Sequence, residues 1–331
     1  MRRRGRDALL LIGALATPPF GYGQSSPPIP DVDRVRLAEA FRLADRIRPR
    51  VWPGWERTPL VVLLVADSME YLIGHPNPTS EFISLGRDPL LRRQVLARPR
   101  RFPPTLLATF PAVGGRATIV IGTAERTGKP SAEWVLTLLH EHFHQWQSSL
   151  PDYYARADAL GLARGDTTGQ WMLNYPFPYD SVPVQRQVKA WAAGLGAALV
   201  TPDDGRVARL ARERAGLRRV LSPEDDRYLE FQLWQEGVPR YVELAAARAA
   251  ARSGEPPGAF RRLPDYVPYA ELAARLRHDL ERQLAELSLG RERRIAFYRL
   301  GAGLALLLEQ GDEDWQLAYR RHPFSMPPLL P

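Results

Sequence analysis

The sequence predicts an α+β protein, with a small mixed sheet in the N-terminal part and mostly helices in the C-terminal part. Two observations predict this class. Apolar runs typical of strands precede Pro130, whereas the periodicity after Pro130 is almost wholly helical. The composition is also globular, with 45% hydrophobic and 25% charged residues among 331, and the 31 prolines indicate many loops and abrupt helix ends.

The first residues are typical of an export signal. Four arginines between residues 2 and 6 precede an apolar run at 8–16, and small residues follow. We expect residues 1–23 to be a signal peptide that is removed, and the protein to be secreted or periplasmic. An uncleaved anchor is the competing interpretation. The run is much shorter than the roughly 20 residues that span a bilayer, so we expect no stable membrane span.

Residues 24–130 are expected to form an α/β subdomain. Residues 32–48 have apolar side chains at helical spacing, and the prolines that follow end this segment. Apolar runs of strand type come next, at 60–65, 105–110 and 117–121. The last two runs should form a hairpin that turns at Gly114 and Gly115.

Residues 131–322 are expected to form a helical subdomain that carries the functional site, and residues 323–331 a loosely held tail. Apolar periodicity predicts helices at 131–150, 152–163, 183–199, 204–220, 224–250, 268–287 and 291–309. Proline-rich breaks separate some of them, at 174–183 and 256–268.

The composition excludes several kinds of chemistry. The chain has no cysteine, which rules out disulfides, a thiol nucleophile and cysteine-ligated zinc. Four arginines and one aspartate of residues 1–23 account for part of the net charge of +8, and the remainder carries +5. Because basic and acidic residues are interspersed, we expect no nucleic-acid partner. The serine-hydrolase elbow G-x-S-x-G and phosphate-binding glycine loops are absent from the sequence.

The predicted helix 131–150 carries the pattern H-E-x-x-H. At about 100° per residue, His144 lies about 40° from His140, and Glu141 about 100° from it, on a polar stripe opposite an apolar face. Two imidazoles one helical turn apart can bind one metal ion, and the adjacent carboxylate can take a proton from water. His142 lies near 200°, within the apolar arc, so we interpret it as a core histidine or one that supports a ligand.

This segment resembles the zincin metallopeptidases. Their metzincin subgroup would require Gly at 147 and His at 150, where this chain has Gln147 and Leu150. The gluzincin subgroup, which includes thermolysin-like peptidases and aminopeptidases, takes a glutamate from a later helix, in a pattern like W-x-x-E-G-x-x-x-Y. Residues 234–241 read W-Q-E-G-V-P-R-Y, so the Glu-Gly pair and the tyrosine match, with the tryptophan one residue nearer. The resemblance implies a zincin-like fold with Glu236 as the third ligand.

The chain departs from the gluzincin pattern in two respects. Glu236 follows His144 after 92 residues, a longer separation than in the well-known members, so an inserted helical region must fold back. Pro239 predicts that the helix kinks just beyond Glu236 or begins there. Other carboxylates therefore stay open as third ligand, namely Glu230, Glu243, Asp152 and Asp166.

The resemblance implies a secreted zinc metallopeptidase acting on a peptide or protein. His140, His144 and Glu236 would bind Zn²⁺, and Glu141 would be the general base. Tyr298, or else Tyr241, would stabilise the developing oxyanion. A strand at 105–112 or 117–122 could pair with an extended substrate. Two alternatives stay open: a catalytically silent zincin-fold binding or scaffold protein, and a zinc hydrolase of non-peptide amides.

Overall fold

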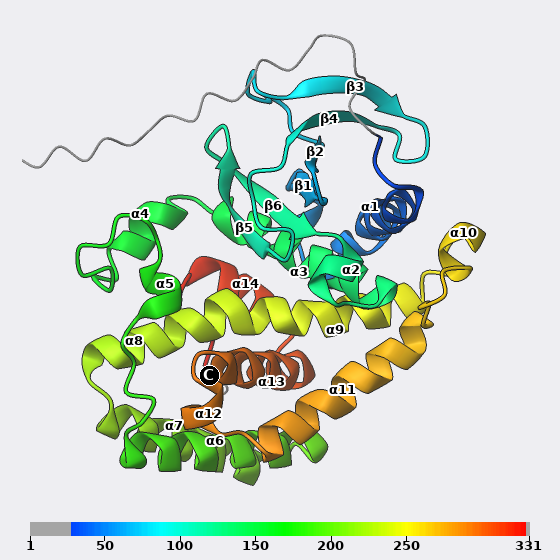
Figure 1. Cartoon of the computed structure of the whole chain (residues 1–331). Helices are drawn as coiled ribbons and strands as arrows, with labels where there is room; N and C mark the ends of the chain where they lie inside the picture. Colours follow the sequence, from blue (N-terminus) through cyan, green and yellow to red (C-terminus); the bar gives the residue numbers. More distant parts are fainter. Residues whose placement is uncertain (1–27, 329–331) are drawn as a thin grey trace, which may run out of the picture.

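The computed structural model describes residues 28–328, and the predicted signal peptide lies outside this range. The chain is a mixed α+β protein with one six-stranded sheet in its N-terminal part and helices after it, as the sequence predicts (Figure 1). The strands are β1 (Val62–Val65), β2 (Met69–Ile73), β3 (Ile83–Asp88), β4 (Arg93–Pro99), β5 (Leu107–Val113) and β6 (Arg116–Gly122).

The sheet has the strand order β3-β4-β2-β1-β6-β5. Strands β1 and β6 pair in parallel, and the other neighbours are antiparallel. The predicted hairpin is β5 and β6, and its turn uses φ angles of 54° at Gly114 and 71° at Gly115, which glycine adopts at little cost. Strand β5 is therefore an edge of the sheet, whereas β6 is an interior strand.

The sequence interpretation missed β2, β3 and β4. Strands β2 and β4 each carry a buried charged residue within their apolar pattern, Glu70 in β2 and Arg98 in β4. The two residues form an ion pair, in which Nε of Arg98 donates to Glu70 at 2.7 Å. Strand β3 is the other edge, and its side chains are exposed or half-buried, so no alternating hydrophobic pattern marks it.

The helices predicted by periodicity occur, most with shifted ends, but the one expected at 224–250 is in three pieces and the one expected at 152–163 ends already at Asp158. The helices are α1 (Asp31–Val51), α2 (Ala124–Thr127), α3 (Ser131–Ser148), α4 (Tyr153–Asp158), α5 (Trp171–Asn174), α6 (Val182–Val200), α7 (Asp204–Val220), α8 (Pro223–Gln232), α9 (Val238–Ala251), α10 (Gly258–Arg261), α11 (Tyr269–Ala285), α12 (Leu289–Glu292), α13 (Ile295–Gly311) and α14 (Trp315–Arg321). A π-helical segment, Leu233–Gly237, joins α8 to α9.

Helix α3 lies where the sheet meets the helical part. It packs against β5 and β6 on one side and against α1 and α9 on others (Figure 1). Because both parts surround it, its polar stripe is buried as well as its apolar face: His140 and Glu141 are each 7% exposed, and His144 is 8% exposed. The site is thus built inside the junction.

One hydrophobic core joins the two parts of the chain. It continues from Ile29 before α1 to Phe324 after α14. Phe324 lies in the segment expected to be a loose tail, yet it is 4% exposed and packs against Tyr153, Phe231 and Trp234. The aromatic side chain holds this part of the tail in the core, so the expectation of a loose end is incorrect there.

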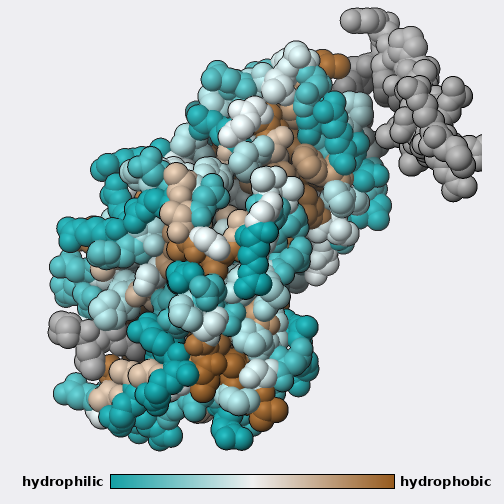
Figure 2. Space-filling view, turned by 90° about the vertical axis from the view of Figure 1, so that its left-hand side faces the viewer, coloured by the Kyte–Doolittle hydropathy of each residue, from teal (hydrophilic) through white to brown (hydrophobic). Residues whose placement is uncertain are grey.

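The surface is mostly hydrophilic in the face shown in Figure 2, where hydrophobic residues gather in a few separate groups. Within residues 28–328, none of the helices combines the length and the hydrophobicity that crossing a bilayer requires.

Candidate metal centre

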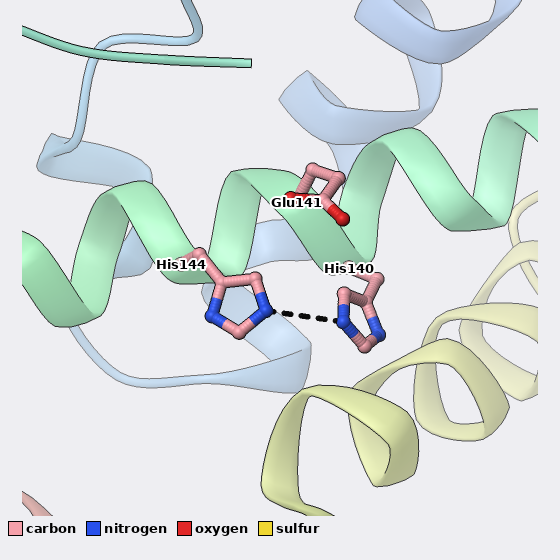
Figure 3. Close-up of side chains that lie close together, drawn as sticks. All are labelled: His140, Glu141 and His144. Atoms are coloured by element: carbon pink, nitrogen blue, oxygen red, sulfur yellow. Dashed lines mark hydrogen bonds between the residues drawn. The ribbon is translucent and has the colours of Figure 1, made fainter. Parts of the chain in front are cut away.

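His140, Glu141 and His144 form a compact cluster on α3. One ligand atom of each lies within 4.8 Å of those of the others. The two imidazole rings come from successive turns and point toward one another, with 3.1 Å between their Nε2 atoms (Figure 3). The helical spacing of the H-E-x-x-H pattern therefore gives the convergence that the sequence predicts.

Glu243 of α9 fixes the ring of His140. Its Oε1 lies 2.7 Å from Nδ1 of His140, and its other oxygen pairs with Arg240. Burial raises the pKa of Glu243, but Arg240 and His140 outweigh burial and lower it to about 2. An ionised carboxylate only accepts hydrogen bonds, so Nδ1 of His140 carries the hydrogen and, in the neutral ring, Nε2 presents a lone pair.

Gln147 fixes the ring of His144 as Glu243 fixes that of His140, with an oxygen that faces Nδ1. Its Nε2 donates to two backbone oxygens, those of Trp234 at 3.1 Å and Gln235 at 3.2 Å. These acceptors determine which end of the amide is nitrogen, so Oε1 faces Nδ1 of His144, at 2.7 Å. Nε2 of Gln235 lies 3.1 Å from the same Nδ1, but the contact with Oε1 of Gln147 is the shorter one. We therefore assign the hydrogen to Nδ1 of His144, which directs the lone pair of Nε2 toward that of His140.

Two lone pairs 3.1 Å apart repel one another unless a cation lies between them. The cation can be a proton: burial lowers the pKa of His144, but the carboxylates of Glu236 and Glu141 outweigh burial and raise it to about 9. A metal ion also fits, because two nitrogen ligands at about 2.0–2.1 Å in tetrahedral geometry are about 3.3 Å apart. The donor set, imidazole and carboxylate without thiolate, suits Zn²⁺ among other divalent ions.

Glu236 lies beside this cluster, on the π-helical segment. Its Oε2 is 3.6 Å from Nε2 of His144. Burial raises the pKa of Glu236, whereas His144, His140 and Arg294 lower it, to about 2 overall. The polypeptide between His144 and Glu236 folds back, as the resemblance requires. The Glu236 carboxylate therefore lies on the side of the imidazole rings that carries the two Nε2 atoms.

The other carboxylates considered as third ligand have different surroundings. Glu243 faces Nδ1 of His140 and not Nε2. Glu230 pairs with Arg214, and Asp166 accepts from the backbone of Thr168 and Trp171. Asp152 precedes α4 with a φ of 57°. None of the latter three has a contact with His140 or His144 in the described part of the chain.

No protein-family model, curated protein or solved structure matches this chain. The function is therefore inferred from the side chains at the site.

The irregularity predicted at Pro239 takes the form of the π-helical segment. Gly237 and Val238 keep right-handed helical angles, and the N–H of Val238 bonds to the carbonyl of Leu233, five residues back. The wider turn admits the proline without ending the helical path. The helical path therefore continues from α8 through this segment into α9, and the predicted irregularity is a change of helix type, without a new helix start at Pro239.

A contact between two glycines holds the π-helical segment against α13. A Cβ atom on Gly237 would lie 2.4 Å from the Cα of Gly301, and one on Gly301 would lie 2.6 Å from the Cα of Gly237. Any side chain at either position would push the backbones apart. This close approach places Glu236 of the segment near Tyr298 of α13.

Of the two tyrosine candidates, the structure brings Tyr298 to the site and places Tyr241 elsewhere. Burial raises the pKa of Tyr298, and so do the charge of Glu236 and a hydrogen bond to it. Arg294 donates to the Tyr298 hydroxyl. The hydroxyl of Tyr241 instead interacts with Glu309, and its ring packs on Trp315, so the expectation that Tyr241 serves the site is not supported.

His142 is a core residue, in agreement with its predicted angle. It is fully buried, accepts from Arg48 at Nε2 (3.0 Å) and donates from Nδ1 to Gln145 (2.9 Å). Burial, and next the charge of Arg48, lowers its pKa to about 3. It is therefore neutral and faces away from the lone pairs of His140 and His144.

Three contributors to the site were not predicted in these roles: Thr109, Gln147 and Glu243. The Thr109 hydroxyl lies 2.8 Å from Oε2 and 2.9 Å from the backbone oxygen of Glu141. Gln147 had a sequence signal, because it follows His144 by three residues on the same helix and can reach its ring. Thr109 and Glu243 come from separate elements, so only the tertiary fold identifies them.

Proposed function

We propose that the protein is a zinc-dependent hydrolase with a gluzincin-like site on a zincin-like fold, that it acts on peptides or proteins, and that it does so after export. The observation that carries the proposal is the pair of Nε2 atoms, 3.1 Å apart, on two rings whose Nδ1 atoms each lie 2.7 Å from a side-chain oxygen. A buried arrangement of this kind favours a cation, and two carboxylates, those of Glu141 and Glu236, lie near it.

His140, His144 and Glu236 would hold the zinc ion, as two imidazoles and one carboxylate do in catalytic sites that keep a position open. A zinc ion held there supplies Lewis acidity, which polarises a carbonyl oxygen and makes water acidic near neutral pH. Glu243 and Gln147 keep the imidazoles in the tautomer that this requires.

Glu141 would accept a proton from the attacking water and pass it to the leaving amine. The Thr109 hydroxyl bonds to Oε2 of Glu141, which holds the carboxylate in place and leaves Oε1 to exchange the proton. Tyr298 would donate to the negative charge that develops on the carbonyl oxygen, since its hydroxyl already lies against Glu236.

The position of β5 supports a peptide substrate. It is an edge strand, and its Thr109 contacts Glu141 directly. An extended peptide that paired with β5 would therefore pass next to the predicted base. Of the two strands left open by the sequence, β5 is the one with an unpaired edge, because β6 lies between β1 and β5.

Metal analysis and a cleavage assay test this proposal. Purified protein should hold about one Zn²⁺ per chain. It should cleave members of a broad peptide library, and a chelator should abolish that cleavage. Glu141→Gln should keep the metal and lose hydrolysis, because the amide cannot accept the proton. Full activity of Glu141→Gln would refute the assignment of the base.

The same assay separates the alternatives. Zinc binding without cleavage of any peptide would favour a catalytically silent binding or scaffold protein, or a hydrolase of non-peptide amides. A panel of small amide substrates, with and without chelator, would then distinguish these two.

A further inference from the structure

Pro239 removes one backbone donor from the helical path that carries Glu236. In α-helical register the carbonyl of Gln235 would accept from the N–H of residue 239, and in π-helical register the carbonyl of Trp234 would do so. Proline has no N–H. Because a buried carbonyl without a partner costs free energy, a donor from elsewhere must replace the missing N–H.

Gln147 brings such a donor from α3. Its Nε2 lies 3.1 Å from the oxygen of Trp234 and 3.2 Å from that of Gln235. The hydroxyl of Tyr319 accepts from Nε2 of Gln147 at 2.7 Å and is itself a second donor to the oxygen of Trp234, at 2.7 Å. At its other end, the Gln147 amide accepts from Nδ1 of His144 at 2.7 Å. One buried side chain therefore bonds to a predicted ligand and to the backbone that carries another.

We infer that Gln147 is a positioning residue of the metal centre, which sets the distance between His144 and Glu236. This role rests on the proposed metal site, and it makes Gln147 one of the residues that determine the affinity of that site for a metal ion. Without the amide, the carbonyls of Trp234 and Gln235 lose a donor and the His144 ring loses the acceptor that fixes its tautomer. The two ligand-bearing elements, α3 and the π-helical segment, are then free to shift relative to each other.

Gln145 is a matched control on the same helix. Its Oε1 accepts from Nδ1 of His142 at 2.9 Å, and its Nε2 donates to the backbone oxygens of Val61 and Ala117, each at 2.9 Å. Each glutamine thus follows a histidine by three residues and bonds to two backbone carbonyls outside α3. Gln145 ties α3 to the sheet, however, and contacts no predicted ligand. Its loss should lower stability and leave the metal site in place.

The test compares the zinc affinity of the wild-type protein, Gln147→Met and Gln145→Met, by competition with a chromophoric chelator. Urea unfolding of each metal-free protein measures stability separately. We expect Gln147→Met to bind zinc about 10–100-fold more weakly, as is usual when a residue that supports a ligand is lost. Gln145→Met should stay within about twofold of wild type, even where it destabilises the protein as much.

Gln147→Glu is a second variant, for the case that Gln147→Met does not fold. Its carboxylate still accepts from His144 but places an oxygen against the oxygens of Trp234 and Gln235. The visible absorption spectrum of bound Co²⁺ reports its coordination sphere. We expect this spectrum to shift away from that of the wild type in Gln147→Glu, in the same direction as in Glu236→Gln. A merely structural role of Gln147 would leave this spectrum as in the wild type.

Wild-type zinc affinity together with an unchanged Co²⁺ spectrum in the Gln147 variants would refute the inference, as would an equal loss of affinity in Gln145→Met. If the wild-type protein bound no divalent ion, the metal centre and the inference would both be refuted. Zinc binding without hydrolysis would refute only the hydrolase proposal.

Discussion

The contact between Gly237 and Gly301 leads to a sharp prediction about Gly301→Ala. The added methyl group would lie 2.6 Å from both the Cα of Gly237 and the oxygen of Leu233, and 3.1 Å from the Cα of Leu233. Carbon atoms in ordinary contact are about 3.5–4.0 Å apart, so the π-helical segment and α13 would have to separate by about 1 Å. Overpacking of this kind costs about 1–3 kcal/mol, against a gain of up to about 1 kcal/mol from replacing a glycine within a helix.

We therefore expect Gly301→Ala to lower the free energy of unfolding by about 1–2 kcal/mol, measured by urea denaturation of the metal-free protein. Zinc affinity should fall too, because Glu236 moves with the segment. Gly196→Ala in α6 is the control: a Cβ atom there meets nothing within 4 Å, so the helix should gain stability. A Gly301→Ala protein as stable as wild type, with unchanged zinc affinity, would show that the glycine contact does not position Glu236.

Three further variants have expected outcomes. Tyr298→Phe should keep zinc content and lower kcat by roughly 10²–10³-fold in the peptide assay if its hydroxyl stabilises the oxyanion, and an unchanged kcat would remove that role. Phe324→Ala should lower the free energy of unfolding by about 3 kcal/mol or more, because its ring lies in the core, and a neutral effect on urea denaturation would contradict that packing. Burial, and next the charge of Glu125, raises the pKa of Asp33 to about 6. The folded protein therefore binds the extra proton between about pH 4 and pH 6, and stability should decline as the pH rises through this window. Asp33→Asn should remove this decline, roughly 3 kcal/mol, so it should be more stable than wild type at pH 7.5 and similar at pH 4; an equal difference at both pH values would contradict the assignment.

The fold was predictable from sequence where one hydrophobic pattern repeats. Helices such as α1 and α6, and the β5–β6 hairpin with its two glycines, follow from local spacing. Strands β2 and β4 were missed because their pairing buries the charges of Glu70 and Arg98, which a pattern of apolar residues cannot show. A buried ion pair depends on the partner strand and has no signature in either strand alone.

The site was predictable to the extent that it lies on one helix. His140 and His144 converge because residues four apart share a face of a helix. Glu236 was predicted as a ligand through a short resemblance, and its carboxylate lies 3.6 Å from Nε2 of His144. The role of Glu243 could not be read from the chain, since it depends on how α9 packs against α3. Sequence reasoning placed this residue among the candidate ligands, whereas its carboxylate faces the other nitrogen of His140.

The burial of α3 between the sheet and the helices has a consequence for how the protein unfolds. The larger core continues from Ile29 to Phe324 and joins the sheet to the helical part, whereas a second, smaller cluster, which includes Leu63 and Val120, lies on the other face of the sheet. Loss of structure should then be a single cooperative transition, and neither half should be stable when expressed alone. An ion that binds only the folded chain, at a free concentration about 1,000 times its dissociation constant, would add about 4 kcal/mol to the stability of the whole molecule. Zinc would thus protect β3, at the far edge of the sheet, as well as the helices around the site.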